Sequence, residues 1–185
     1  MRILPYLLAL LAVSASHAQD APNWLVEPFP VPEIRLAEPG PDEVVVVIND
    51  NALGGNHAGL FAGPLLIDPA GSYVWMRQRD ANWAGPSLAD YAHYQTTDGP
   101  EVRFYRFHLQ PGAFEAIRQR IREAGPTPPL FCASAVQNLL VEIAPFDGIA
   151  ETGFTTPAAL GRRLDALTRG ADAVGECQKL DASPC

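Results

Sequence analysis

The sequence predicts an α+β fold, in which a small antiparallel sheet is packed by two to three helices. A β-branched run and two further strand-like segments follow one another with only short turns between them, which indicates a meander. A segment of alternating side chains follows at 102–109. Apolar residues then recur at helical spacing in three later segments, which begin near 112, 132 and 157.

The strands are expected where β-branched and apolar residues form short runs between turn residues. Val44 to Ile48 is a continuous β-branched run, typical of a buried central strand. Asn56 to Ala62 follows a turn cluster rich in Asn and Gly, and Gly63-Pro64 turns the chain into Leu65 to Asp68. Val102 to Leu109 alternates between two faces and predicts another strand.

The helices are expected from periodicity and from residues that start or stop a helix. Ser87 to Tyr94 predicts a short helix with Ser87 as its N-cap. Gly112 to Ala124 carries an apolar stripe and is followed by Gly and Pro. The next helix opens at Cys132 and is expected to continue until Pro145 stops it. Thr156-Pro157 predicts the start of the last helix.

The two ends of the chain differ in composition from the part between them. Residues 1–18 combine a basic start, an apolar run and small residues before a cleavage point, which predicts a signal peptide. The apolar run is about a dozen residues, shorter than the roughly 20 of a membrane span. Residues 19–41 are rich in Pro and predict an extended arm. One domain is expected over 42–170, followed by a tail at 171–185.

Charge and export narrow the class of partner. The net charge is −8 at pH 7, which argues against binding nucleic acid or an anionic membrane but leaves a cationic partner open. The predicted signal peptide implies a periplasmic or secreted protein. No cofactor is expected.

Three cysteines remain after the expected cleavage. An oxidising compartment favours disulfides, and an odd count leaves one thiol over. Cys177 and Cys185 lie close together in the polar tail and are expected to pair. Cys132 would then be the free thiol, either as a reactive group or as a buried structural cysteine.

Cys132 has the setting of a catalytic thiol. Cysteine hydrolysis needs a thiolate, because the thiol itself is a poor nucleophile. The positive end of a helix stabilises a thiolate, and the backbone amides there can donate to an oxyanion. Small Ala133 and Ser134 follow Cys132 and leave room for a substrate.

His57 and Asp68 supply the other parts of a cysteine hydrolase. A histidine must take the thiol proton and pass it to the leaving group, and a third polar group must fix the imidazole tautomer. Continuing the predicted hairpin ladder brings Asp68 opposite about His57. Ala58 and Gly59 after His57 would let another element pass close to the backbone.

The order of these motifs resembles the circularly permuted papain-like superfamily, relatives of the NlpC-type cell-wall amidases that include lecithin:retinol acyltransferase. Asn56 to Phe61 is similar to its His-x-Gly strand, and Phe131 to Ser134 to its nucleophile helix. Thr156 to Leu160 resembles its downstream Thr-Pro-x-x-Leu segment, whereas Phe131 replaces a frequent Asn. The resemblance implies cleavage or transfer at an amide or ester bond through an acyl-enzyme, with Cys132, His57 and Asp68 as the triad. With export, it points to peptidoglycan peptides as substrate.

Two other functions stay open at this point. One is a non-catalytic periplasmic binding or interaction protein that uses the aromatic stretch at 73–94, which is equally consistent with ordinary packing. The other is an acyltransferase or lipid-ester hydrolase with the same triad. A metal site formed by His93 and His108 with Asp90 or Asp98 is disfavoured, because no His-x-x-x-His or Cys-x-x-Cys spacing is present.

Overall fold

A computed structural model describes residues 34–53, 55–149 and 153–185. The predicted signal peptide and most of the predicted arm lie outside the described residues. The strands are β1 Glu43–Asn49, β2 His57–Ala62, β3 Leu65–Ile67, β4 Val102–His108 and β5 Glu176–Gln178. The α-helices are α1 Tyr73–Arg77, α2 Leu88–Gln95, α3 Pro111–Glu123, α4 Cys132–Leu140 and α5 Pro157–Thr168, with short 3₁₀ turns η2 Thr96–Asp98 and η3 Phe146–Ile149.

The five strands form one antiparallel sheet in the order β3-β2-β1-β4-β5. β1 is the central strand, and every one of its residues is buried. Val44 and Val46 enter the apolar core on one face, while Val45 and Val47 enter the core on the other. The continuous β-branched run is therefore explained by burial on both faces. The predicted α+β class with an antiparallel sheet is confirmed.

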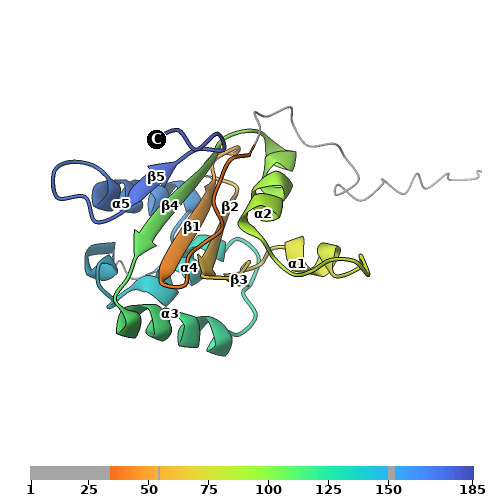
Figure 1. Ribbon diagram of the computed structural model, residues 1–185, viewed down its shortest axis with the longest axis horizontal. Helices are drawn as coiled ribbons and strands as arrows, with labels where there is room; N and C mark the ends of the chain where they lie inside the picture. Colours follow the sequence, from red (N-terminus) through yellow and green to blue (C-terminus); the bar gives the residue numbers. More distant parts are fainter. Residues whose placement is uncertain (1–33, 54, 150–152) are drawn as a thin grey trace, which may run out of the picture.

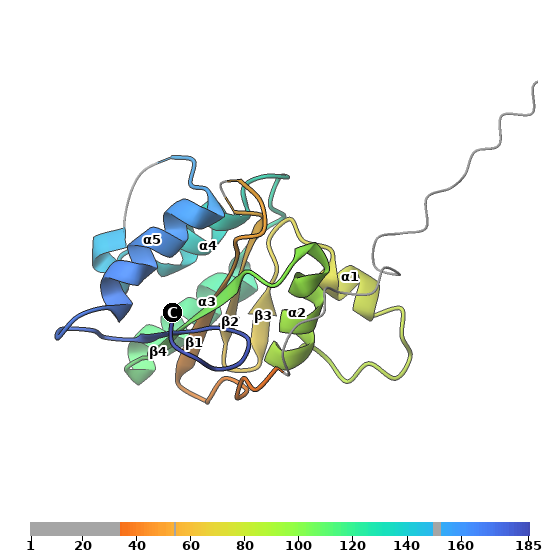
Figure 2. The same cartoon turned by 90° about the horizontal axis from the view of Figure 1, so that it is seen from above.

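The helices are divided between the two faces of the sheet (Figures 1 and 2). α3, α4 and α5 pack on one face through apolar residues such as Ile117, Val136 and Leu160. α1 and α2 cover the other face with Tyr73, Leu88 and other apolar residues. The α4 helix lies against β2. Cys132 at the start of α4 and His57 at the start of β2 interact with each other, so the two elements begin side by side.

Two local features differ from the sequence predictions. α1 was not expected, since its segment is short and lacks a clear helical stripe. α4 ends at Leu140, before Pro145, because Val141 has an extended backbone and Glu142 has a positive φ of 64°. This turn carries Phe146 back onto the sheet, where its ring packs edge-on against Phe107 at 4.8 Å between centroids.

The tail is part of the sheet rather than an appendage. β5 pairs with β4, and Cys177 and Cys185 form a disulfide with Cα atoms 5.4 Å apart. Cys132 is the free cysteine, as the cysteine count predicted. None of the helices in the described ranges is both long and apolar enough to cross a bilayer.

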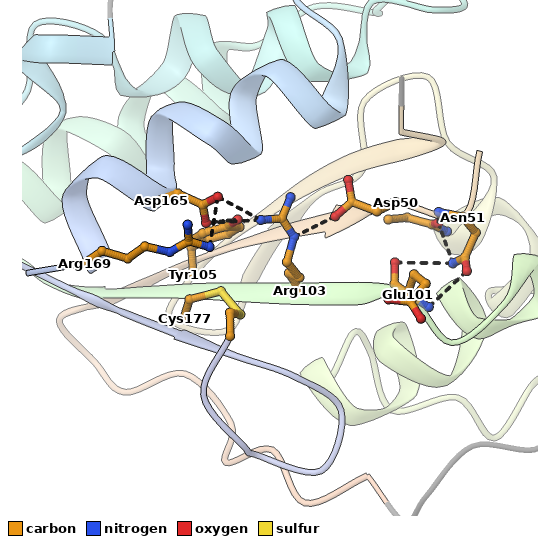
Figure 3. A network of polar contacts seen from close by, with 10 residues as sticks. Asp50, Asn51, Glu101, Arg103, Tyr105, Asp165, Arg169 and Cys177 are labelled. Atoms are coloured by element: carbon orange, nitrogen blue, oxygen red, sulfur yellow. Dashed lines mark hydrogen bonds and ion pairs between the residues drawn. A yellow bond between two sulfur atoms is a disulfide. The ribbon is translucent and has the colours of Figure 1, made fainter. Parts of the chain in front are cut away.

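An arginine network joins β4 to its neighbours (Figure 3). Arg103 Nε donates to Asp50 Oδ2 at 2.6 Å, just beyond the end of β1. Arg103 Nη1 donates to Asp165 Oδ1 on α5 at 3.1 Å, and the Tyr105 hydroxyl donates to the same oxygen at 2.8 Å. The network therefore fastens α5 to the sheet.

Candidate active site

Cys132 is the first residue of α4. Pro128 and Pro129 cannot belong to a helix interior, and Leu130 has a positive φ of 73°, so the helix begins directly after this turn. Phe131 at the N-cap position makes no side-chain cap hydrogen bond. The Cys132 side chain thus lies at the positive end of the helix dipole, and the residue is only 5% exposed.

His57 opens β2 and Asp68 follows directly after β3. The β2–β3 register pairs Leu60 with Ile67, so the ladder continues to Gly59 opposite Asp68. The expected position of Asp68, opposite about His57, is therefore off by two residues. His57 and Gly59 share one face of the strand, so the carboxylate reaches the imidazole diagonally. His57 Nε2 and Asp68 Oδ1 lie 2.6 Å apart.

Two tyrosines hold the Asp68 carboxylate in place. The Tyr91 hydroxyl, from α2, donates to Oδ1 at 2.7 Å, and the backbone N–H of Tyr73 donates to Oδ2 at 3.1 Å. Both tyrosine side chains are fully buried. Asp68 is therefore oriented by two donors besides the imidazole, as a positioning carboxylate must be.

Two glycines make the space that this arrangement needs. A Cβ atom at Gly59 would lie 2.3 Å from the Tyr91 hydroxyl oxygen, and one at Gly71 would lie 2.1 Å from Asp68 Oδ2. The close approach that the small residues after His57 predicted is thus the tyrosine hydroxyl. A side chain at either position would displace the carboxylate network.

The imidazole of His57 joins the carboxylate to the thiol. Because its Nε2 contacts Asp68, Nδ1 is the ring nitrogen left for Cys132. Burial lowers the pKa of His57, but hydrogen bonds to Asp68 and Cys132, together with their charges, raise it to about 9. The side chain therefore carries a positive charge at neutral pH.

The pKa of the Cys132 thiol shifts in the opposite direction to that of His57. Burial raises its pKa, but the hydrogen bond and charge of His57 lower it, and backbone hydrogen bonds from Ala58 and Ala133 lower it further. The net shift is downward from the ordinary value. A thiolate–imidazolium pair is the state that a nucleophilic cysteine requires.

The aromatic stretch at 73–94 serves mainly as packing. The ring of Tyr73 contacts Tyr91, Trp83 and Tyr94, with centroids 5.0, 6.0 and 5.4 Å away. Trp75 is the exception, since it is exposed and lies beneath the Arg79 guanidinium. Sequence reasoning missed that Tyr91 contacts Asp68, because this contact depends on how α2 packs across β2.

The histidines of the disfavoured metal site lie on separate elements. His93 is on α2, whereas His108 ends β4 near Asp42 at 3.6 Å. Within the described ranges, no group of three or more His, Cys, Asp or Glu side chains could hold a metal ion. Ser134, the other hydroxyl in the nucleophile segment, accepts from the backbone N–H of Thr155 at 2.9 Å and is occupied structurally.

Comparisons with protein-family models, with curated proteins and with solved structures give no match to this chain.

Proposed function

We propose that this protein is a cysteine amidohydrolase or peptidase that works through an acyl-enzyme. Cys132 is the nucleophile, His57 the general base and acid, and Asp68 the residue that orients the imidazole. One observation carries the proposal: a single imidazole lies between a fixed carboxylate and the free thiol of Cys132. Both partners raise the pKa of the imidazole, and the imidazole lowers the pKa of the thiol. A purely structural cysteine needs no such partner.

In the first step, the Cys132 thiolate attacks the carbonyl carbon of the scissile amide. A C–S bond forms and the carbonyl electron pair moves to oxygen, where the Cys132 backbone N–H at the start of α4 donates to it. The C–N bond then breaks as the His57 imidazolium gives its proton to the leaving nitrogen. The products are a free amine, a thioester on Cys132 and a neutral imidazole.

In the second step, water replaces the amine. Neutral His57 takes a proton from water, whose oxygen bonds to the thioester carbon, and the C–S bond breaks. The carboxylic acid leaves, and the thiolate–imidazolium pair is restored. Asp68 holds the imidazole in the orientation and tautomer that both steps need.

The substrate class follows from family resemblance and compartment. The motif order supports a circularly permuted papain-like enzyme, and the predicted signal peptide and the disulfide support a periplasmic or secreted location. In that compartment, the peptides of peptidoglycan are the amide substrate that the proposal favours.

A second candidate, an acyltransferase or lipid-ester hydrolase, is favoured by exposed apolar residues that precede Cys132 in the chain and by one that contacts them. Leu130, Phe131 and Phe154 are all exposed, and the two phenylalanine rings contact each other edge-on at 5.4 Å. Phe131 precedes Cys132 directly, and Phe154 precedes the Thr155 segment that bonds to Ser134 on α4. An acyl group on Cys132 would lie near this apolar surface, which suits a fatty chain.

The test is the pH dependence of Cys132 alkylation by iodoacetamide, in the wild type and in His57→Ala. A lowered pKa means that thiolate is present at lower pH, so the wild type should react well below pH 8.5. Removing His57 leaves burial, which raises the pKa of the thiol, so the profile should move upward. Mass spectrometry of the labelled peptide identifies the modified residue.

An unreactive thiol, or one that titrates near pH 8.5 in both proteins, would contradict the hydrolase and favour the non-catalytic binding protein. A reactive wild-type thiol then separates the two catalytic candidates by substrate. Release from a short peptide amide supports the amidohydrolase, whereas turnover of long-chain esters alone supports the lipid enzyme.

A further inference from the structure

Residues 34–41, which we call the strap, lie just before β1 on the face of the sheet that α1 and α2 cover. Leu36 is 8% exposed and belongs to the buried apolar residues of that face. The guanidinium of Arg106 on β4 donates through Nη2 to the carbonyl oxygen of Ala37. The last part of the predicted extended arm is therefore attached to the fold.

Glu38 of the strap binds the first turn of α2. Its Oε2 accepts from the backbone N–H of Leu88 at 2.7 Å, and its Oε1 accepts from that of Ala89 at 3.2 Å. Ser87 Oγ accepts from the next N–H, that of Asp90, at 3.2 Å. The first N–H groups of a helix have no partner within the helix, and its positive end favours a negative charge. A carboxylate 50 residues away from Leu88 thus completes the start of α2.

The α2 helix carries the tyrosine that holds the Asp68 carboxylate. Leu88 and Tyr91 are three positions apart, share one face of α2 and are both fully buried. The Tyr91 hydroxyl donates to Asp68 Oδ1, the same oxygen that contacts His57 Nε2. Burial, and then the charge of Asp68, raise the pKa of Tyr91 well above its ordinary value. The hydroxyl therefore keeps its proton and remains a donor.

The two ends of α2 are fixed by different parts of the chain. At the last turn, Asn49 Nδ2 donates to the carbonyl oxygen and to Oε1 of Gln95, both at 3.0 Å, and both side chains are buried. At the first turn, Asp90 pairs with Arg77 of α1, and these two side chains are each 34% exposed. Loss of Glu38 should therefore loosen the first turn while the last turn stays in place, so that the residue between them moves.

We propose that Glu38 is a positioning residue for the reactive thiol: it fixes the first turn of α2, so that Tyr91 keeps Asp68 against His57. The inference rests on the proposed function and adds that activation of the thiol depends on the strap before the sheet. Glu38 itself is exposed, so its replacement leaves the apolar core unchanged.

The test is the pH profile of Cys132 alkylation by iodoacetamide in the wild type, Glu38→Ala and Glu38→Asp. When Asp68 is no longer held, the pKa of His57 falls and that of the thiol rises. Alkylation of Glu38→Ala at pH 7 should therefore be at least about threefold slower, as for loss of a helix cap, with the same plateau at high pH. Aspartate keeps the charge on a shorter side chain, so Glu38→Asp should restore part of the rate.

A double-substitution experiment tests the route through the tyrosine. Tyr91→Phe removes the hydroxyl and keeps the ring. In this background, Glu38→Ala should change the rate at pH 7 by less than about 1.5-fold, because the group that it positions is already absent. Glu115→Ala is the control, since it removes a carboxylate that pairs with Arg122 on the other face of the sheet and should not move the profile. Urea unfolding would verify that each variant is folded under the assay conditions.

The outcomes separate this inference from the function beneath it. A wild-type thiol that reacts well below pH 8.5, with an unchanged profile in Glu38→Ala, overturns the role of Glu38 and leaves the proposed function standing. An equal loss in the presence and absence of the Tyr91 hydroxyl overturns the route through Asp68. A wild-type thiol that titrates near pH 8.5 overturns the proposed function and the inference together.

Discussion

Two carboxylate networks, one on β2 and β3 and the other on β4 and α5, are built from nearly the same parts. In each, a tyrosine hydroxyl donates to an aspartate: Tyr91 to Asp68 at 2.7 Å, and Tyr105 to Asp165 at 2.8 Å. They differ in the cation, which is His57 in one network and Arg103 in the other. A guanidinium keeps its proton at any physiological pH, whereas an imidazole can release it.

The difference shows that buried charge alone does not make a reactive site. The Arg103 network joins Asp50 to Asp165 and holds two elements together (Figure 3). The His57 network ends instead at a thiol, whose pKa it lowers. The His57 network differs from the Arg103 network in two ways. Its cation can release a proton, and it lies next to a thiol that becomes nucleophilic when it loses its own proton.

The largest effect is expected when the aspartate of each network is replaced by asparagine and the two variants are compared. Asp68→Asn should lower amide hydrolysis by about 10²-fold, because the imidazolium loses its orienting charge. It should also lower the pKa of His57 and move the alkylation profile of Cys132 to higher pH. Asp165→Asn should leave the rate of hydrolysis unchanged within about twofold and should not move the alkylation profile.

For stability, the Arg103 network is the one expected to respond to the substitution. Asp165→Asn weakens a partly buried ion pair and a tyrosine hydrogen bond, and should lower the free energy of unfolding by about 1–2 kcal/mol. Urea unfolding would measure it. Loss of thiol reactivity in Asp165→Asn at full stability would break the proposed separation of roles.

A smaller effect is expected from adding a methyl group at the glycine beside the His57 network. Gly59→Ala puts a Cβ 2.3 Å from the Tyr91 hydroxyl, which is held inside the core. Hydrolysis should fall about tenfold and stability by about 1–3 kcal/mol. Urea unfolding and alkylation kinetics would measure both.

Gly161→Ala is the matched control for Gly59→Ala. Gly161 lies inside α5, and a Cβ at this position would be 2.5 Å from Arg103 Nη2, the far end of a flexible side chain. Alanine is favoured over glycine in a helix by about 0.5–1 kcal/mol, so the net change should be within about 1 kcal/mol. If the two substitutions lowered hydrolysis and stability equally, the contact of Tyr91 with Asp68 would not be what makes Gly59→Ala harmful.

The smallest effect on chemistry should come from the tail. Replacing both Cys177 and Cys185 by serine removes the disulfide beside β5 and leaves Cys132 as the sole cysteine. Stability should fall by about 2–3 kcal/mol for a loop of this length. The alkylation profile of Cys132 should not move, and a shift would show that the tail is coupled to the His57 network through the sheet.

Sequence patterns predicted the elements that carry the site better than the details around it. The β-branched run of β1, the alternation of β4 and the Cys132 helix start all follow from local rules, and the described structure has them. The proximity of His57 and Asp68 follows from the hairpin, although the register was two residues off. The catalytic roles of the three side chains stay predictions.

The features that were missed depend on contacts between distant parts of the chain. Tyr91 contacts Asp68 because α2 crosses β2 at Gly59, a contact 23 residues apart that no local pattern encodes. Glu38 binds the first turn of α2 across 50 residues, and Asp165 meets Arg103 across 62 residues. The end of α4 was misplaced because the chain leaves the helix at Val141 and Glu142, before Pro145, and no local sequence signal marks that turn.

The hairpin that carries His57 and Asp68 also has a consequence for folding. These residues are 11 positions apart and belong to adjacent strands, so they can meet early, since short hairpins form within microseconds. Cys132 joins them only when α4 docks on the completed sheet. The β1–β4 pairing of that sheet joins residues 53 to 65 positions apart and closes more slowly than the hairpin. Until then Cys132 lacks the imidazole that lowers the pKa of its thiol. The activated thiolate therefore exists only in the nearly folded protein, where the thiol is already buried.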